Sequence, residues 1–190
     1  SMRQFLGLLR LVAMLIRGRA PLRISFAGGG TDVSPYADDH GGAVLNTTID
    51  KHAYASLETR DDSLFQISDL DEGLEVVGGV FDTLKYDGKY DLAKAVIKRL
   101  DVMAGFTLRL HADAPWGTGL GSSSTHIVAV LGVFSHWLRL GLTDYELAEM
   151  AFQLERVDIG QAGGRQDQYS ATFGGFNFIE FGENGTMVSP

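Results

Sequence analysis

A glycine- and serine-rich loop is the stretch of this sequence best suited to chemistry: Pro115-Trp116-Gly117-Thr118-Gly119-Leu120-Gly121-Ser122-Ser123-Ser124. It precedes the run Thr125–Leu140, which is apolar almost all round and therefore predicts a buried helix. Free N–H groups at a helix N-terminus and the helix dipole attract anions without a lysine. Hydroxyls at Ser122–Ser124 can add donors to a phosphate or a ligand to Mg²⁺. The loop therefore predicts a phosphate site.

The loop differs from two familiar phosphate-binding patterns. No Gly-Lys-Ser/Thr follows it, so it is not a Walker A loop. Ser122 stands in the place of the third glycine of Gly-x-Gly-x-x-Gly, so it is not a dinucleotide fingerprint either. A glycine turn with a serine N-cap, the commonest use of such residues, is the competing interpretation.

Two carboxylates favour the phosphate site. Thr143-Asp144-Tyr145-Glu146 is a capping box, which predicts a helix reaching about Val157. Glu155 follows Ala151 by four residues and so falls within the apolar arc of this helix, where a carboxylate is costly unless it is paired, hydrogen-bonded or bound to metal. A salt-bridged glutamate at a fraying helix end is the alternative. The spacing places these residues on the opposite, polar face: Glu146, Glu149, Gln153 and Arg156.

The second carboxylate, Asp167, lies in the glycine turn Gly163–Tyr169 before the final strand. By itself it is typical of a cap or turn aspartate. Three other sites are weaker candidates. His126 on the buried helix is expected to be a core histidine or to border a nucleotide. Trp116 beside the loop is expected to have a plain packing role, and packing against the nucleotide base is the alternative. Asp69, Asp71 and Glu72 are expected to form an acidic surface loop.

The elements that position these residues are predicted to be an α+β arrangement, with strands first, then two long helices, then a closing strand. Period-two alternation or short apolar runs predict the strands, and a spacing of Leu92, Val96, Ile97 and Leu100 predicts a further helix over Asp91 to Met103. The predicted strands are Pro21–Ala27, Ala43–Ile49, His52–Thr59, Leu64–Ser68, Leu74–Val77, Phe106–Asp113 and Gly175–Phe181.

Composition excludes several classes of protein. Lys and Arg number 16 and Asp and Glu number 24, so the net charge of −8 lacks the basic footprint of a nucleic-acid binder. The absence of cysteine excludes a disulfide scaffold and fits a cytoplasmic protein. The apolar stretch Phe5 to Ile16 is too short and interrupted to span a membrane. A small-molecule partner is therefore expected, and the sequence defines no oligomeric state.

The N-terminus is expected to lie outside the domain. Leu8, Leu11, Val12 and Leu15 fall on one helical face, so an amphipathic helix is one interpretation. The other is that the first thirteen residues are upstream sequence without function. We assign residues 1–17 to an N-terminal extension and 18–190 to the domain.

The motifs resemble those of the GHMP kinases, a family that includes galactokinase, homoserine kinase and mevalonate kinase. Ala20–Asp32 resembles the family's first motif, and Pro115–Ser124 resembles its second, the nucleotide phosphate loop. Glu155–Asp158 and Gly163–Phe178 are most similar to the D-glycero-D-manno-heptose 7-phosphate kinases, with fucokinases as near neighbours. The resemblance covers about residues 18–182. It implies an N-terminal kinase domain, with a mixed sheet packed against helices.

The resemblance also implies roles for residues in ATP- and Mg²⁺-dependent phosphoryl transfer. Asp167 would orient or deprotonate the accepting sugar hydroxyl, and Arg23 would keep it ionised and neutralise the phosphoryl group. Ser123 and Glu155 would share Mg²⁺, and Asp32 would bind a sugar hydroxyl. The loop residues implied to hold ATP are Pro115, Gly117, Gly119, Leu120, Gly121, Ser122, Ser123 and Ser124, and those implied to bind the sugar are Gly29, Gly30, Thr31 and Asp32.

One departure and several alternatives accompany this hypothesis. The family has a third glycine-rich motif in a C-terminal domain, which nothing after Ser170 resembles, so we expect an N-terminal portion that is inactive alone. The expected acceptor is the anomeric hydroxyl of heptose 7-phosphate. The alternatives are a fucokinase-like enzyme on an unphosphorylated sugar, a non-catalytic sugar or nucleotide sensor, and a folding or interaction domain. The presence of both Asp167 and Glu155 argues against the sensor.

Overall fold

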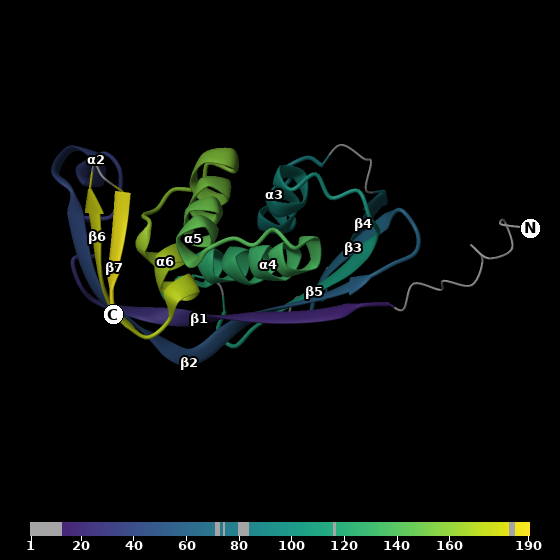
Figure 1. The fold of residues 1–190 in the computed structure, drawn as a ribbon, viewed down its shortest axis with the longest axis horizontal. Coiled ribbons are helices and arrows are strands. Elements are labelled where there is room, and N and C mark those ends of the chain that lie inside the picture. The colour runs from purple at the N-terminus through teal and green to yellow at the C-terminus, as the bar shows by residue number, and fades with distance from the viewer. Residues whose placement is uncertain (1–12, 71–72, 74, 80–83, 116, 183–184) are drawn as a thin grey trace, which may run out of the picture.

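A computed structural model describes residues 13–70, 73, 75–79, 84–115, 117–182 and 185–190. One face of a long, twisted sheet is covered by helices (Figure 1). The strands are β1 (Leu15–Ala27), β2 (Gly42–Thr59), β3 (Leu64–Asp69), β4 (Glu75–Gly79), β5 (Phe106–Ala112), β6 (Phe176–Gly182) and β7 (Gly185–Ser189). The helices are α2 (Tyr36–His40), α3 (Asp91–Arg99), α4 (Ser122–Leu138), α5 (Asp144–Phe152), the π-helix η1 (Gln153–Asp158) and α6 (Gln166–Phe173).

The sheet is organised around β2. Its first half pairs with β6 and its second half with β5, both antiparallel, while β1 follows its other edge. The order is β4-β3-β5-β2-β6-β7, with β3 and β5 parallel and β1 off this path. β2 is one continuous strand, so the prediction of two separate strands at Ala43–Ile49 and His52–Thr59 was wrong.

The main core lies between the sheet and the helices α3 and α4. Its largest fully buried members include Phe106, Phe134 and Leu131, with the Phe106 and Phe134 rings edge-to-face at 5.1 Å. A smaller core joins α5 and α6 to β6 through Ala148, Tyr169 and Ile179. Burial of these apolar side chains fixes α4 across the sheet and α6 at its end.

The domain begins earlier than expected. Leu15 pairs with Glu58 and Arg17 with Ser56, so residues 15–17, assigned to the extension, belong to β1. Leu15 is therefore in a strand, and the other members of the predicted amphipathic face lie outside the described residues. Within the described part of the chain, no helix has the length and apolar run that a membrane span requires.

The predicted start of the helix at the capping box Thr143–Glu146 is confirmed. The Thr143 hydroxyl accepts from the Glu146 amide, and the Glu146 carboxylate accepts from the Thr143 amide, as a capping box requires. The helical segment then changes type, because α5 ends at Phe152 and η1 continues to Asp158. Three elements were not predicted as such: the short helix α2, the helix α6, expected to be a turn, and the last strand β7.

Candidate active site

The glycine-serine loop leads directly into α4. Its glycines adopt the left-handed conformation, with φ values of 79° at Gly117, 72° at Gly119 and 77° at Gly121. The helix begins at Ser122, three residues before the predicted start, so Ser122–Ser124 form its first turn. No side chain among the described residues caps this end. Seventeen residues of aligned peptide dipoles thus end at a glycine-lined turn suited to an anion.

The first strand holds this loop in place. The Arg23 amide donates to the Leu120 carbonyl at 3.2 Å, and Arg23 Nη1 donates to the Gly119 carbonyl at 2.7 Å. Within the loop, the Thr118 hydroxyl donates to the Pro115 carbonyl at 3.2 Å. These bonds hold residues 118–120 of the loop in place.

Asp167 lies over the N-terminal end of α4. It stands in the first turn of α6, where Arg23 Nε donates to its Oδ1 at 2.7 Å and Arg23 Nη2 lies 2.5 Å from the same oxygen. A Cβ added to Gly121 would lie 3.1 Å from Asp167 Cγ, so the carboxylate lies close to the loop backbone. The prediction of a turn aspartate was wrong, because Gln166–Phe173 is helical. The structure does bring Asp167, Arg23 and the loop together.

The protonation of Asp167 reflects competing effects. Burial raises the pKa of its carboxyl above the ordinary value, the Arg23 guanidinium lowers this pKa, and the nearby Asp32 carboxylate raises it again. The net direction is upward. Arg23 was expected to keep Asp167 ionised. It does lower the pKa of Asp167, but the upward effect of burial on this pKa is larger. A carboxylate with a raised pKa is a better proton acceptor.

Glu155 is buried in η1, as the helical spacing predicted. The Ser123 hydroxyl donates to its Oε1, and the Ser124 hydroxyl donates to its Oε2 at 2.7 Å. A carboxylate and a hydroxyl side by side are hard oxygen ligands of the kind that Mg²⁺ takes. In the described part of the chain no group of three or more His, Asp or Glu side chains could hold a metal.

The loop Gly28–Asp32 adjoins the other side of Asp167. The Asp32 carboxylate is buried and accepts from the Gly30 amide and from the Gln166 amide, both at 3.1 Å. It therefore binds the N-terminus of α6, one residue before Asp167. Gly29 and Gly30 are exposed. Thr31 is tied down, since its hydroxyl donates to the Gly28 carbonyl at 2.7 Å.

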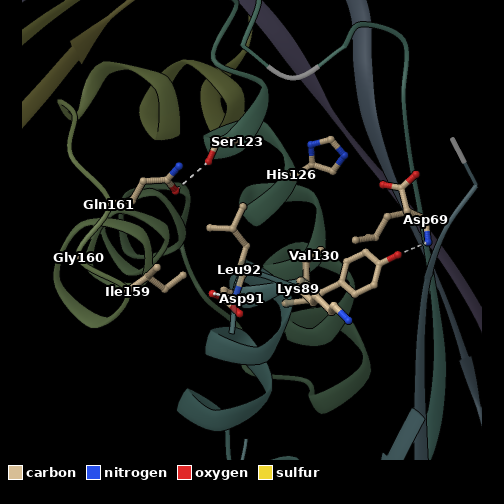
Figure 2. Close-up of a pocket in the computed structure, with 14 residues that line it drawn as sticks. Asp69, Lys89, Asp91, Leu92, Ser123, His126, Val130, Ile159, Gly160 and Gln161 are labelled. Carbon is tan, nitrogen blue, oxygen red and sulfur yellow. Dashed lines mark hydrogen bonds between the residues drawn. The ribbon is translucent and has the colours of Figure 1, made fainter. Parts of the chain in front are cut away.

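A cavity of about 510 Å³ opens beside the first turns of α4. The loop before α3, the end of β3, one face of α4 and the segment after η1 form its walls (Figure 2). Ser123 and Gln161 meet at one end, where Ser123 Oγ lies 3.2 Å from Gln161 Oε1 (Figure 2). The lining combines aliphatic side chains such as Leu92 and Val130 with polar groups, as small-molecule sites do.

The predictions for His126 and for Asp69 have different outcomes. His126 is buried and its Nδ1 lies 2.9 Å from the Ser122 carbonyl oxygen, and it also lines the cavity. Asp69 was expected on the surface, but it is buried at the end of β3 and lines the same cavity. The predicted positions of Trp116, Asp71 and Glu72 lie outside the described residues.

Sequence reasoning missed two residues beside Glu155. Arg156 was assigned to the polar face, but only 12% of its side chain is exposed, and its Nη2 donates to Ser124 Oγ at 3.2 Å. Gln168 is fully buried, and its Nε2 donates to Glu155 Oε2 at 2.7 Å. The sequence signal that could have identified Gln168 is its position directly after Asp167, a candidate site residue.

Comparison with known proteins defines the class. A family model described as the GHMP kinases N terminal domain matches residues 89–175. The architecture, a mixed sheet with helices, matches that of solved GHMP kinases. The chain has the fold of the GHMP kinase N-terminal domain, and its sequence is similar to that of kinases with this fold.

Particular relatives are closer in sequence. The chain is 42% identical over 180 residues to the D-glycero-alpha-D-manno-heptose 7-phosphate kinase of Campylobacter jejuni, covering 91% of this chain and 52% of that protein. A crystal structure of a D-glycero-D-manno-heptose 1-phosphate kinase from Bacteroides thetaiotaomicron has 42% identity and a TM-score of 0.88, covering 93% of this chain and 60% of that one. The L-fucokinase/L-fucose-1-P guanylyltransferase of Bacteroides fragilis is 28% identical, over 93% of this chain and 21% of that protein. The chain thus spans about half the length of the heptose kinase.

Proposed function

We propose that this protein is an ATP- and Mg²⁺-dependent sugar kinase that phosphorylates a hydroxyl of a sugar phosphate, the anomeric hydroxyl of D-glycero-D-manno-heptose 7-phosphate. One observation carries the proposal. The Asp167–Arg23 pair and the Glu155–Ser123 pair, from four separate elements, converge on the N-terminal end of α4. The similarity to heptose phosphate kinases supports the choice of sugar.

The nucleotide is assigned to the loop and the cavity beside it. The α-, β- and γ-phosphates would lie along the backbone from Gly117 to Gly121 and the first turn of α4, where Ser122 and Ser123 offer donors. The base and ribose would occupy the cavity of about 510 Å³, which begins at Ser123 and falls within the volume range of small-molecule sites.

The metal site is assigned to Ser123 and Glu155. Their oxygens adjoin each other at the loop, and a carboxylate with a serine hydroxyl suits the preference of Mg²⁺ for oxygen. When bound, Mg²⁺ would neutralise charge on the phosphates. Glu155 must exchange the hydrogen bond from Ser123 for the ion, and its burial strengthens that interaction.

The acceptor is assigned to the side of Asp167 that faces Gly29–Asp32. Asp167 would orient the sugar hydroxyl and accept its proton as the oxygen attacks the γ-phosphorus, while the bond to the ADP oxygen breaks. Arg23, already bonded to Asp167 and to the loop, would stabilise negative charge on the transferred group. Asp32 fixes the start of α6, and it offers a sugar hydroxyl a second contact only if the buried carboxylate becomes accessible.

ADP release by the full-length gene product tests this proposal. The acceptor panel is heptose 7-phosphate, unphosphorylated heptose, fucose and galactose. Turnover confined to the phosphorylated heptose is the expected result. Turnover on a free sugar alone would retain the kinase and overturn the proposed acceptor, in favour of the fucokinase-like alternative. Binding of Mg·ATP with no turnover on any acceptor would favour the sensor.

Replacing Arg23 with glutamine is expected to change the pH profile. Arg23 lowers the pKa of Asp167, so its removal moves that pKa further up. The reaction requires the carboxylate, so activity is lost as the pH falls through this pKa, and the acid limb of kcat/KM should move to higher pH. Loss of the guanidinium should also lower kcat about a hundredfold.

The control for this variant is Arg19→Gln, which replaces an exposed arginine on the same strand. This control should leave both the acid limb of kcat/KM and the value of kcat unchanged. An acid limb at the same pH in the wild type and in Arg23→Gln would refute the electrostatic role of Arg23.

A further inference from the structure

The carboxylate of Glu155 is held by three neutral donors. Ser123 Oγ donates to Oε1, while Ser124 Oγ and Gln168 Nε2 each donate to Oε2 at 2.7 Å. Arg156 Nη1 lies 3.4 Å from Oε1. Because Glu155 is fully buried, these contacts replace its hydration, and they determine where the carboxylate lies.

Gln168 connects Glu155 to the helix that carries Asp167. It follows Asp167 in α6 and is fully buried. Successive residues of a helix project about 100° apart, so one turn of α6 directs Asp167 toward Arg23 and Gln168 toward Glu155. A shift of α6 that moved Asp167 would therefore stretch the bond from Gln168 to Glu155.

Ser124 joins Gln168 to Arg156. Its hydroxyl donates to Glu155 Oε2 and accepts from Gln168 Nε2 at 3.1 Å and from Arg156 Nη2 at 3.2 Å. One donated and two accepted bonds are all that a hydroxyl can form. The four side chains Glu155, Gln168, Ser124 and Arg156 thus form one connected network, which we call the buried link.

Arg156 also shapes the segment that leads from η1 to α6. Its Nε donates to the Gly164 carbonyl at 3.2 Å, and its Nη1 donates to the Ala162 carbonyl at 3.2 Å and the Gln161 carbonyl at 3.4 Å. A Cβ on Gly163 would lie 2.6 Å from Arg156 Cζ, so the chain folds closely around the guanidinium. Arg156 therefore sets the path by which the backbone enters the helix of Asp167.

We propose that Gln168 and Arg156 are positioning residues, which through the buried link fix the metal-binding carboxylate of Glu155 relative to Asp167. The inference rests on the proposed function, since it assigns these two residues to the same phosphoryl transfer. They act through Glu155 and Asp167 and contact neither nucleotide nor sugar. Residues that orient a metal ligand from behind typically change metal affinity or activity by about 10–100-fold.

Two variants test the buried link in the full-length gene product. Gln168→Met keeps the length of the side chain and removes both polar atoms, and Arg156→Lys keeps the charge and removes the planar fork. Each should lower kcat about 10–100-fold with little change in KM for the acceptor, and each should raise the Mg²⁺ concentration for half-maximal activity. The double variant should lose less than the product of the single effects, because both act through one network.

Gln153 and Arg99 provide matched controls for Gln168 and Arg156. Gln153 Nε2 donates to Glu149 Oε1 at 2.8 Å, and Arg99 pairs with Asp158 at 3.6 Å, both outside the buried link. Gln153→Met and Arg99→Gln should keep wild-type kcat and metal dependence. Urea unfolding of every variant shows which losses come from unfolding alone.

Mn²⁺-dependent binding of a non-hydrolysable ATP analogue supplies a readout without turnover. Gln168→Met should weaken binding with Mn²⁺ and leave binding without metal unchanged. A wild-type kcat and metal dependence in Gln168→Met, or a loss of kcat matched by unfolding with unchanged metal dependence, would overturn the inference while the kinase stands. A wild type that neither binds the analogue nor releases ADP would overturn the proposed function and this inference together.

Discussion

The variant Asp167→Asn is expected to lower kcat about 10²- to 10⁴-fold, the usual contribution of a positioned general base. Asparagine keeps the size of the side chain and can still accept from Arg23 Nε, which now lies 2.7 Å from Asp167 Oδ1. It cannot accept the proton of the sugar hydroxyl. Because the nucleotide is assigned to the loop and the cavity, the affinity for Mg·ATP should remain near that of the wild type. Single-turnover kinetics and calorimetric titration separate the two quantities.

The control is Asp62→Asn, which removes a carboxylate paired with Arg60 on a distant loop. It should keep wild-type kcat. Asp167→Asn with full activity would show that Asp167 is neither the base nor the group that orients the hydroxyl. A parallel loss of kcat and of Mg·ATP affinity would assign Asp167 to nucleotide binding instead.

The second large effect is expected from Glu155→Gln. The amide preserves the shape of the buried site but removes the charge that would attract Mg²⁺. The Mg²⁺ concentration for half-maximal activity should rise about a hundredfold or more, since a direct ligand is worth at least as much as the groups behind it. A Mg²⁺ titration of ADP release at saturating ATP measures this change.

Folding is the main concern for Glu155→Gln, because its two oxygens accept from Ser123, Ser124 and Gln168. Urea unfolding and binding of metal-free ATP analogue therefore accompany the titration. Glu58→Gln, an exposed glutamate paired with Arg109, is the matched control and should titrate like the wild type. An unchanged titration in a folded Glu155→Gln protein would exclude Glu155 as a metal ligand.

The strands and the buried carboxylate could be predicted because their patterns are local. Alternating or short apolar runs located β3, β5 and the second half of β1, and the four-residue spacing from Ala151 located Glu155 on the buried face. The glycine-serine loop was identified for the same reason, since a helix start and its glycines are adjacent in sequence. These elements needed no knowledge of distant contacts.

The π-helix explains why Arg156 was misplaced. A regular helix of 3.6 residues per turn puts Arg156 on the polar face with Glu149 and Gln153. The i→i+5 bonding of η1 adds a residue to the turn and rotates the side chains after it, so that Arg156 faces Ser124 and the segment 161–164. Such insertions leave no periodic signal, and they are frequent at functional sites.

The helix α6 was missed because its N-terminus is stabilised from far away in the sequence. It is short, lies between glycine pairs and has no local side-chain cap within the described residues. Its first amide instead donates to Asp32, 134 residues earlier in the chain. The sequence around Asp167 therefore resembled a turn, and only tertiary contacts make it a helix.

The central claim, transfer of a phosphoryl group to a sugar hydroxyl at the N-terminal end of α4, is tested most directly by the product. ³¹P NMR of the full-length gene product with Mg·ATP and heptose 7-phosphate distinguishes the phosphorus atoms of substrate, nucleotide and product. We predict a new sugar-phosphate resonance coupled to the anomeric proton, one equivalent of ADP, and retention of the 7-phosphate signal. ADP with free inorganic phosphate and no new sugar phosphate, or no reaction, would contradict the claim.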